Sequence, residues 1–268
     1  MSSSPNSELH LLASTRFDPL LSTLKWNNDH DGPSQYLLLP YHLDRLVDAA
    51  GLHGWEKAKA CLNYEALKST CHRAVTDYLA QSEAALAVKI RVIVSESGEL
   101  KASVSPTTPF PADPTSASFF NPLSDNSTLF GPVFALHMDS QYSPTSLFTS
   151  TKTTERSVYN DARTRAGLPI IPTPSILADV LMYNAQNLIT ETSIFNVAFY
   201  RTPYWITPSA STGCLPGVLR RWLLEQGRIH EAKDNSLTKD NIREGDWVLL
   251  FNGVQGCRLG RIANFGYT

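Results

Sequence analysis

The first residue with a clear chemical capability is a lysine in the middle of the chain. Lys152 lies in a Ser/Thr-rich stretch, Phe148 to Arg156, at the start of a predicted helix. If such a lysine is desolvated, its pKa falls and its amine can form a Schiff base with a carbonyl compound. Most lysines are solvated surface charges, so position alone does not make Lys152 catalytic.

A carboxylate, Glu191, lies between two apolar runs that are typical of strands. A buried carboxylate must be paired, because removing an isolated charge from water is costly. The protonated nitrogen of a pyridine ring would serve as the partner. An ordinary salt bridge or a helix N-cap is the commoner explanation.

Two further features could bind an anion such as phosphate. The loop from Ser211 to Arg221 opens a helix at Gly217, and the first N–H groups of that helix, at Val218 and Leu219, have no partner within it. Arg45 carries a guanidinium group, whose fork of donors matches a phosphate. A simple glycine-started helix and a surface arginine are the plain alternatives.

The elements that must position these residues are both helical and extended. Helical spacing predicts helices near 41–50, 64–81, 155–167 and 217–225. Apolar and β-branched runs predict strands at 35–40, 87–95, 100–104, 178–183, 194–200, 205–207, 247–252 and 258–262, and a further segment at 132–138. Hairpins are more evident than βαβ crossovers, so the order favours an α+β fold.

A change in composition divides the chain. From Ser105 to Ser127 it is rich in Pro, Ser, Thr and Asn, which is typical of a linker. We therefore predict a small N-terminal α/β domain at 1–110, an interdomain linker at 111–130, and a larger C-terminal domain with the lysine at 131–268. Residues 1–8 are expected to form a flexible tail.

Composition and charge exclude several classes of function. The 268 residues include 23 Lys and Arg against 25 Asp and Glu, a net charge of -2, which gives no global attraction to nucleic acid or to an anionic membrane. No apolar run reaches the roughly 18 residues of a membrane helix, and no secretory signal pattern is present. The four cysteines and seven histidines show no metal-binding spacing. We therefore expect a cytoplasmic protein without metal, nucleic acid or membrane partner.

Several weak signals together, in chain order, resemble the class IV (fold type IV) pyridoxal-phosphate enzymes. This family includes branched-chain and D-amino-acid transaminases and aminodeoxychorismate lyase. The matching segments are His42 to Leu46, Lys152 to Arg156, Thr190-Glu191 with Asn196, and Trp205-Ile206-Thr207-Pro208 running to Gly213 to Arg220. The resemblance covers about Leu12 to Ile262. It implies a two-domain, D-amino-acid-aminotransferase-like architecture, an active site between the domains and a homodimer.

The resemblance also implies a role for each chemical feature. Lys152 would bind pyridoxal 5'-phosphate as a Schiff base and later move protons. Glu191 would keep the pyridine nitrogen protonated, and Arg45 with the N–H groups of Val218 and Leu219 would hold the phosphate. The cofactor would do the carbanion chemistry, and the protein would supply orientation and electrostatics.

Three positions favour one member of the family. D-amino-acid transaminases bind the substrate carboxylate through a Thr-Arg-Gly stretch where this chain has Val94 to Ser97. Branched-chain transaminases have a tyrosine five residues after the lysine, where this chain has Ser157. Arg156, four residues after the lysine, resembles the lyase. The resemblance therefore implies a 4-amino-4-deoxychorismate lyase, which forms 4-aminobenzoate and pyruvate for folate synthesis.

For a small anionic substrate of this kind, position in the chain and side-chain chemistry give further candidates. A hydroxyl, of Ser14 or Thr15, would protonate the departing group. Asn252 and the residues after it would line the site, and one of three cations would meet a substrate carboxylate: Lys89, Arg91 or Arg156. A structural ion pair explains each cation equally well.

Two other functions stay open at this point. One is a class IV transaminase that acts on an amino acid or amine. The other is a catalytically inactive relative that works as a binding or scaffold protein, against which the presence of Lys152 and Glu191 argues.

Overall fold

The computed structural model describes residues 8–82, 86–233 and 236–263. It contains both helices and sheets and confirms the predicted α+β class. The chain divides into two compact units, here called the first unit (Met1–Pro109 and Thr151–Arg156) and the second unit (Phe110–Ser150 and Ser157–Thr268). The predicted linker, 111–130, lies in the second unit and forms two short 3-10 helices, Ser116–Phe119 and Ser127–Phe130. The predicted N-terminal tail lies mostly outside the described residues.

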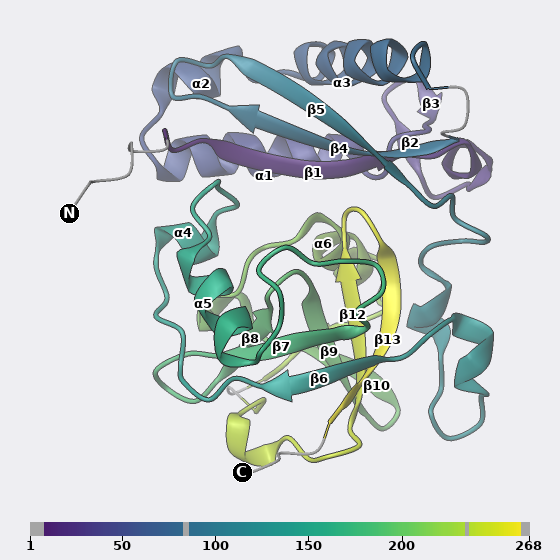
Figure 1. Ribbon diagram of the computed structural model, residues 1–268, viewed down its shortest axis with the longest axis vertical. Coiled ribbons are helices and arrows are strands. Elements are labelled where there is room, and N and C mark those ends of the chain that lie inside the picture. The colour runs from purple at the N-terminus through teal and green to yellow at the C-terminus, as the bar shows by residue number, and fades with distance from the viewer. Residues whose placement is uncertain (1–7, 83–85, 234–235, 264–268) are drawn as a thin grey trace. The chain divides into compact units, whose positions relative to one another are not determined.

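The first unit is a three-stranded antiparallel sheet in the order β1-β4-β5, accompanied by helices (Figure 1). Its elements are β1 (Leu11–Phe17), the 3-10 helix η1 (Pro19–Thr23), β2 (Asn28–Asp29), β3 (Gly32–Pro33), α1 (Leu39–Leu52), α2 (Glu56–Cys61), α3 (Tyr64–Leu79), β4 (Ala87–Val94) and β5 (Leu100–Thr107). The predicted helices near 41–50 and 64–81 and the predicted hairpin of 87–95 with 100–104 are confirmed.

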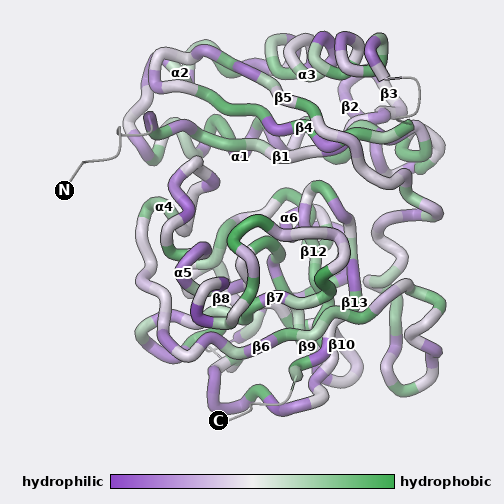
Figure 2. The backbone as a smooth tube through the Cα atoms, in the orientation of Figure 1, coloured by the Kyte–Doolittle hydropathy of each residue, from purple (hydrophilic) through white to green (hydrophobic). Residues whose placement is uncertain are grey.

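Side-chain alternation along β4 gives this sheet two different faces. Val88, Ile90 and Val92 are fully buried in a core with residues of α1 and α3, while Lys89 and Arg91 point to the opposite face. Hydrophobic and hydrophilic stretches alternate along α3 in Figure 2, as expected of a helix with one face on this core. The sheet therefore has an apolar face under the helices and a basic face away from them.

A segment distant in sequence completes the sheet of the first unit. The Leu12 N–H donates to the Lys152 carbonyl at 2.8 Å, and the Thr154 N–H donates to the His10 carbonyl at 2.9 Å. A bridge between Leu11 and Thr153 continues the same pairing. Thr151–Arg156 therefore joins the edge of β1 and belongs to the first unit.

One predicted element is wrong. The run 35–40 is not a strand: it turns at Leu38, whose φ is 52°, and α1 begins at Leu39. Pro40 explains the difference, because a residue without an N–H cannot donate within a sheet but fits the first turn of a helix. The run is apolar because it is buried; Leu37, for example, has no exposed surface.

The second unit contains an eight-stranded mixed sheet in the order β11-β10-β9-β12-β13-β6-β7-β8 (Figure 1). Its strands are β6 (Phe134–Met138), β7 (Ala178–Tyr183), β8 (Ile189–Thr192), β9 (Asn196–Arg201), β10 (Tyr204–Thr207), β11 (His230–Glu231), β12 (Trp247–Asn252) and β13 (Gly256–Ile262). Its helices are α4 (Leu147–Ser150), α5 (Ser157–Arg165) and α6 (Val218–Glu225), with short 3-10 helices η4 (Ala210–Thr212) and η5 (Lys239–Asn241). All the strands predicted for this half of the chain are present, with β8 and β11 in addition.

Helix α5 packs on β7 and so lies close to the end of β8. Tyr159 and Ala162 of the helix form a small core with Val180 and Met182 of the strand. Helix α6 packs near β12. None of the helices within the described ranges has the length and hydropathy needed to cross a membrane.

Candidate functional site

The backbone of Lys152 is fixed from two sides within the first unit. Its carbonyl accepts the bond from Leu12 of β1, and the hydroxyl of the preceding Thr151 lies 2.9 Å from Nε2 of His53. His53 caps the C-terminus of α1 and packs against the Trp55 ring, with centroids 5.4 Å apart. The lysine therefore sits on an ordered segment between a strand and a helix end.

Arg45 and a buried histidine lie beside this lysine. His42 and Arg45 are three residues apart on α1 and so share one of its faces. His42 is only 1% exposed. Burial, followed by the positive charges of Arg45 and Lys152, holds the pKa of His42 well below its usual range. The first unit thus brings together the predicted Schiff-base lysine and the predicted phosphate-binding arginine.

The surroundings of His42 fit a polar ligand. Within the part of the chain that the structure describes, neither ring nitrogen of His42 has a hydrogen-bond partner. A buried polar group without a partner costs about 1–3 kcal/mol, and a ligand that supplies one would remove that cost. With an amine and a guanidinium next to it, the set of donors suits a ligand that carries an aldehyde and a phosphate.

Basic residues gather on the face of the β1–β4 pair that is turned away from the helices. In the register of this pair, Ser14 stands opposite Arg91 and Arg16 stands opposite Lys89. Desolvation, and then the positive charges of Arg91 and Arg156, lower the pKa of the Lys89 amine. The structure therefore brings the three predicted substrate-binding cations into electrostatic range of one another, where an anion would relieve their repulsion.

The two candidate hydroxyls lie on opposite faces of β1. Thr15 is fully buried, and its hydroxyl donates to the Leu37 carbonyl at 2.8 Å. Ser14 is half-buried and lies on the face that carries Arg91. Of the two, Ser14 is the one on the basic face.

In the second unit, Glu191 is buried and surrounded by hydrogen-bond donors. The hydroxyl of Tyr159 donates to its Oε1 at 2.9 Å, and the Leu215 N–H donates to the same oxygen at 3.2 Å. The amide nitrogen of Asn196 lies 3.4 Å from Oε2. Only 5% of Glu191 is exposed, and its charge is compensated by this ring of donors, as the sequence required of a buried carboxylate.

The predicted phosphate loop is tied to the same carboxylate. Asn196 donates to the Leu215 carbonyl at 2.8 Å, and Gly217 is the N-cap of α6. A Cβ atom at Gly217 would lie 1.9 Å from Oδ1 of Asn196, so only glycine allows this approach. Val218 and Leu219 follow as the first two residues of α6, where backbone N–H groups lack helical partners.

Asn252 organises the turn between β12 and β13. Its Oδ1 accepts the N–H groups of Val254 and Gln255 at 2.9 and 2.8 Å, and its Nδ2 donates to the Ile194 carbonyl at 3.2 Å. Ile194 lies three residues after Glu191, so this turn is held against the β8–β9 connection. The amide of Asn252 is thus already engaged within the protein.

Two neighbours of the predicted residues were not assigned a role from the sequence. Tyr159 has no characteristic spacing from Lys152 or Glu191, and only its helical spacing from Ala162 places it on a buried face. His42 could have been found, because it precedes Arg45 by three residues. Cys214 also lies near Glu191; burial raises the pKa of its thiol to about 11, so it stays protonated at neutral pH.

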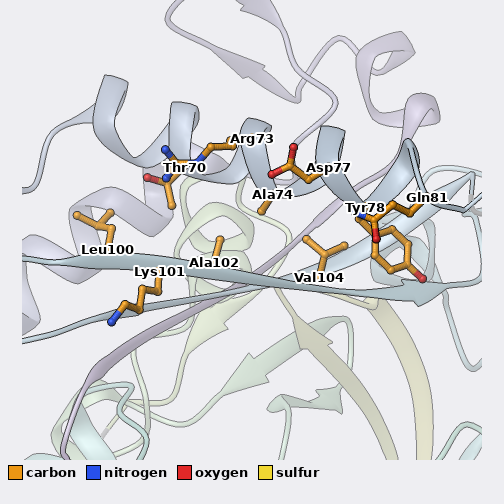
Figure 3. Close-up of a pocket in the computed structure, with 10 residues that line it drawn as sticks. All are labelled: Thr70, Arg73, Ala74, Asp77, Tyr78, Gln81, Leu100, Lys101, Ala102 and Val104. Carbon is orange, nitrogen blue, oxygen red and sulfur yellow. The ribbon is translucent and has the colours of Figure 1, made fainter.

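A surface groove elsewhere in the first unit contains none of these residues. It has a volume of about 440 Å³ and lies where side chains of α3 and β5 face one another (Figure 3). Its lining residues are Thr70, Arg73, Ala74, Asp77, Tyr78, Gln81, Leu100, Lys101, Ala102 and Val104. Among the described residues, no three His, Cys, Asp or Glu side chains are grouped so that they could hold a metal ion.

Comparison with known proteins gives a consistent family. Residues 20–261 match the family model described as amino-transferase class IV. A Schizosaccharomyces pombe protein named "Putative aminodeoxychorismate lyase" is 43% identical over 130 residues, which are 48% of this chain and 54% of that protein. The aminodeoxychorismate lyase of Saccharomyces cerevisiae is 31% identical over 194 residues, 65% of this chain and 51% of that protein. The chain thus spans about half the length of these curated relatives.

A solved structure supports the fold. A hypothetical aminotransferase from Mycobacterium tuberculosis, in a form with α-ketoglutarate and PMP bound, superposes with a TM-score of 0.62 at 16% identity, covering 96% of this chain and 81% of that one. The fold type IV architecture and the family resemblance inferred from the sequence are confirmed, and pyridoxal phosphate is the cofactor of this family. The chain belongs to the class IV aminotransferase family.

Proposed function

We propose that the chain is a pyridoxal-phosphate-dependent 4-amino-4-deoxychorismate lyase that forms 4-aminobenzoate and pyruvate. The observation that carries this proposal is the name shared by both curated relatives, at 43% and 31% identity. The basic face around Arg91 supports it, because the substrate carries two carboxylates.

The candidate residues carry the chemical groups that the cofactor needs. We assign Lys152 to its aldehyde and Glu191 to its ring nitrogen. The phosphate is assigned to Arg45 and to the N–H groups of Val218 and Leu219. The types of donor support each assignment: an amine, a buried carboxylate, a guanidinium and the start of a helix.

The basic face would orient the substrate. Lys89, Arg91 and Arg156 carry the positive charges that two carboxylates require. Burial is the main cause of the lowered pKa of Lys89, and the charges of Arg91 and Arg156 add to it; an anion that binds here would offset their repulsion. Asn252 has its amide engaged in the β12–β13 turn, so its expected contribution is to shape the site around that turn.

When bound, pyridoxal phosphate would supply an aldehyde for the substrate amine and a protonated ring that accepts electrons. Lys152 Nζ would take the proton from the carbon of the substrate ring that bears the amine. The bond between the neighbouring carbon and the enolpyruvyl oxygen breaks, and the substrate ring becomes aromatic. The Ser14 hydroxyl, on the same face as Arg91, would protonate the departing enolpyruvate, which becomes pyruvate.

The description of the family as aminotransferases favours a second candidate, a class IV transaminase. On the same scaffold, Lys152 would move a proton between the substrate carbon and the cofactor, and no carbon–oxygen bond would break. The two reactions differ in their products and in the final form of the cofactor.

The decisive experiment supplies enzymatically made 4-amino-4-deoxychorismate to the purified protein loaded with cofactor. We expect 4-aminobenzoate and pyruvate in equal amounts, and no product from Lys152→Ala. Conversion of bound cofactor to its amine form by an amino acid, reversed by a keto acid, would support the transaminase. Cofactor bound without either reaction would contradict both proposals. A homodimer and a cytoplasmic location stay predictions of the resemblance.

A further inference from the structure

We propose that Tyr159 is a positioning residue for the reaction, whose hydroxyl holds the Glu191 carboxylate in place and keeps it less basic than the cofactor's ring nitrogen. The inference rests on the proposed function, because it assumes that Glu191 faces that nitrogen. It concerns a residue to which the family pattern seen in the sequence assigned no role.

The geometry places the tyrosine hydroxyl directly on the carboxylate. Tyr159 is 8% exposed and Glu191 is 5% exposed, and the O–H to Oε1 distance is 2.9 Å. The Leu215 N–H donates to the same oxygen at 3.2 Å, so this oxygen receives two hydrogen bonds. Hydrogen bonds between a neutral donor and an ionised acceptor are stronger than those between neutral groups.

The helix that carries Tyr159 is anchored to the strand end that carries Glu191. Arg163, one turn further along α5, donates to Asp179 of β7 at 3.1 Å and to the hydroxyl of Ser193 at 2.8 Å. Ser193 lies two residues after Glu191. Because these groups are buried, the helix and the carboxylate are held in a fixed relation within the second unit.

The electrostatic consequence follows from this arrangement. Donors to a carboxylate stabilise its charged form and make it a weaker base. A weaker base leaves a shared proton on the ring nitrogen, where it makes the ring a better electron acceptor. The nearby Cys214 adds no competing negative charge, because burial keeps its thiol protonated at neutral pH.

The first test uses the protein without cofactor, so that it does not depend on the proposed function. Carbon-13 NMR of labelled glutamate carboxyls gives the pKa of Glu191, assigned with Glu191→Gln. We expect Tyr159→Phe to raise this pKa by about one unit, the effect of losing one hydrogen bond to a charged group. The matched control is Tyr183→Phe, which removes a buried hydroxyl that contacts Lys239 at 3.1 Å. An unchanged pKa in Tyr159→Phe overturns the proposal.

The second test uses the loaded protein with cofactor labelled with nitrogen-15 in its ring. In Tyr159→Phe the ring nitrogen signal should move toward that of a neutral pyridine, and kcat should fall about tenfold with a smaller change in KM. An unchanged nitrogen signal beside a raised Glu191 pKa overturns the role toward the ring. A wild-type protein that binds no cofactor contradicts the proposed function instead, and the first test then shows that the hydrogen bond itself is real.

Discussion

The approach of Gly217 to Asn196 predicts a large effect from one added methyl group. The backbone of Gly217 has φ -67° and ψ 144°, which alanine adopts without strain, so only the new Cβ matters. That Cβ would lie 1.9 Å from Oδ1 of Asn196, whereas real Cβ contacts are at least 3.0 Å. The two groups must therefore separate by about 1 Å.

The separation breaks a hydrogen bond that orders the site. Asn196 holds the Leu215 carbonyl at 2.8 Å, and a shift of its side chain by about 1 Å removes that bond. A buried hydrogen bond left unmade costs about 1–3 kcal/mol, and overpacking costs about as much. We expect Gly217→Ala to lose about 2–4 kcal/mol in stability. At about 2–4 °C per kcal/mol, its Tm should fall by roughly 4–16 °C.

Thermal unfolding of matched variants measures this effect. The control is Gly51→Ala in α1, where the nearest atom to the new Cβ is Nζ of Lys59 at 3.6 Å. Its Tm should be unchanged or raised, since alanine favours the helix by up to about 1 kcal/mol. In an Asn196→Ala background the clash is absent, and Gly217→Ala should then cost less than about 1 kcal/mol. Equal losses in both backgrounds would refute the reasoning.

Three further predictions follow from the first unit. His42 titrates near 6.5 when unfolded but well below that when folded, so the unfolded chain binds the extra proton. The free energy of unfolding should therefore fall as the pH drops below about 6.5, by up to about 1.4 kcal/mol per pH unit. Urea unfolding at several pH values measures this slope, and His42→Leu should flatten it. Arg91→Gln should raise the KM of the lyase reaction at least about tenfold, whereas Lys101→Gln, at an exposed position, should not; equal KM values would exclude a carboxylate contact. Thr15→Val should lose about 1–2 kcal/mol without a specific loss of kcat, whereas Ser14→Ala should lower kcat and leave Tm unchanged; the opposite pattern would reverse the two roles.

Much of the fold could be predicted because its signals are local. The β-branched run before Ser95 and the turn after it specify the β4–β5 hairpin, and apolar spacing specifies α1 and α3. The prediction of a strand at 35–40 was wrong because the apolar pattern and the proline there indicate different structures. Apolar residues there indicated a strand, but Pro40 favours the first turn of a helix. Hydropathy alone does not distinguish a buried turn from a buried strand.

For the candidate site too, local sequence signals indicate some features, and long-range contacts determine the others. Lys152, Arg45 and Glu191 were proposed as site residues from residue type and the order of motifs. The contacts around them depend on long-range pairing, which spacing does not reveal. The pairing of Leu12 with Lys152 joins residues 140 positions apart, and the Tyr159–Glu191 bond joins a helix to a strand end 32 positions away. Which hydroxyl of β1 lies on the basic face required the strand register.

The attachment of residues 151–156 to β1 has a practical consequence for anyone who wishes to study the halves separately. A fragment that stops at Pro109 would contain Arg45 but not Lys152. The N–H group of Leu12 would then lose its hydrogen-bond acceptor, the Lys152 carbonyl. The unpaired edge of β1 could then form hydrogen bonds with other chains and cause aggregation. A fragment that reproduces the first unit would need residues 151–156, either fused through a linker or added as a separate peptide.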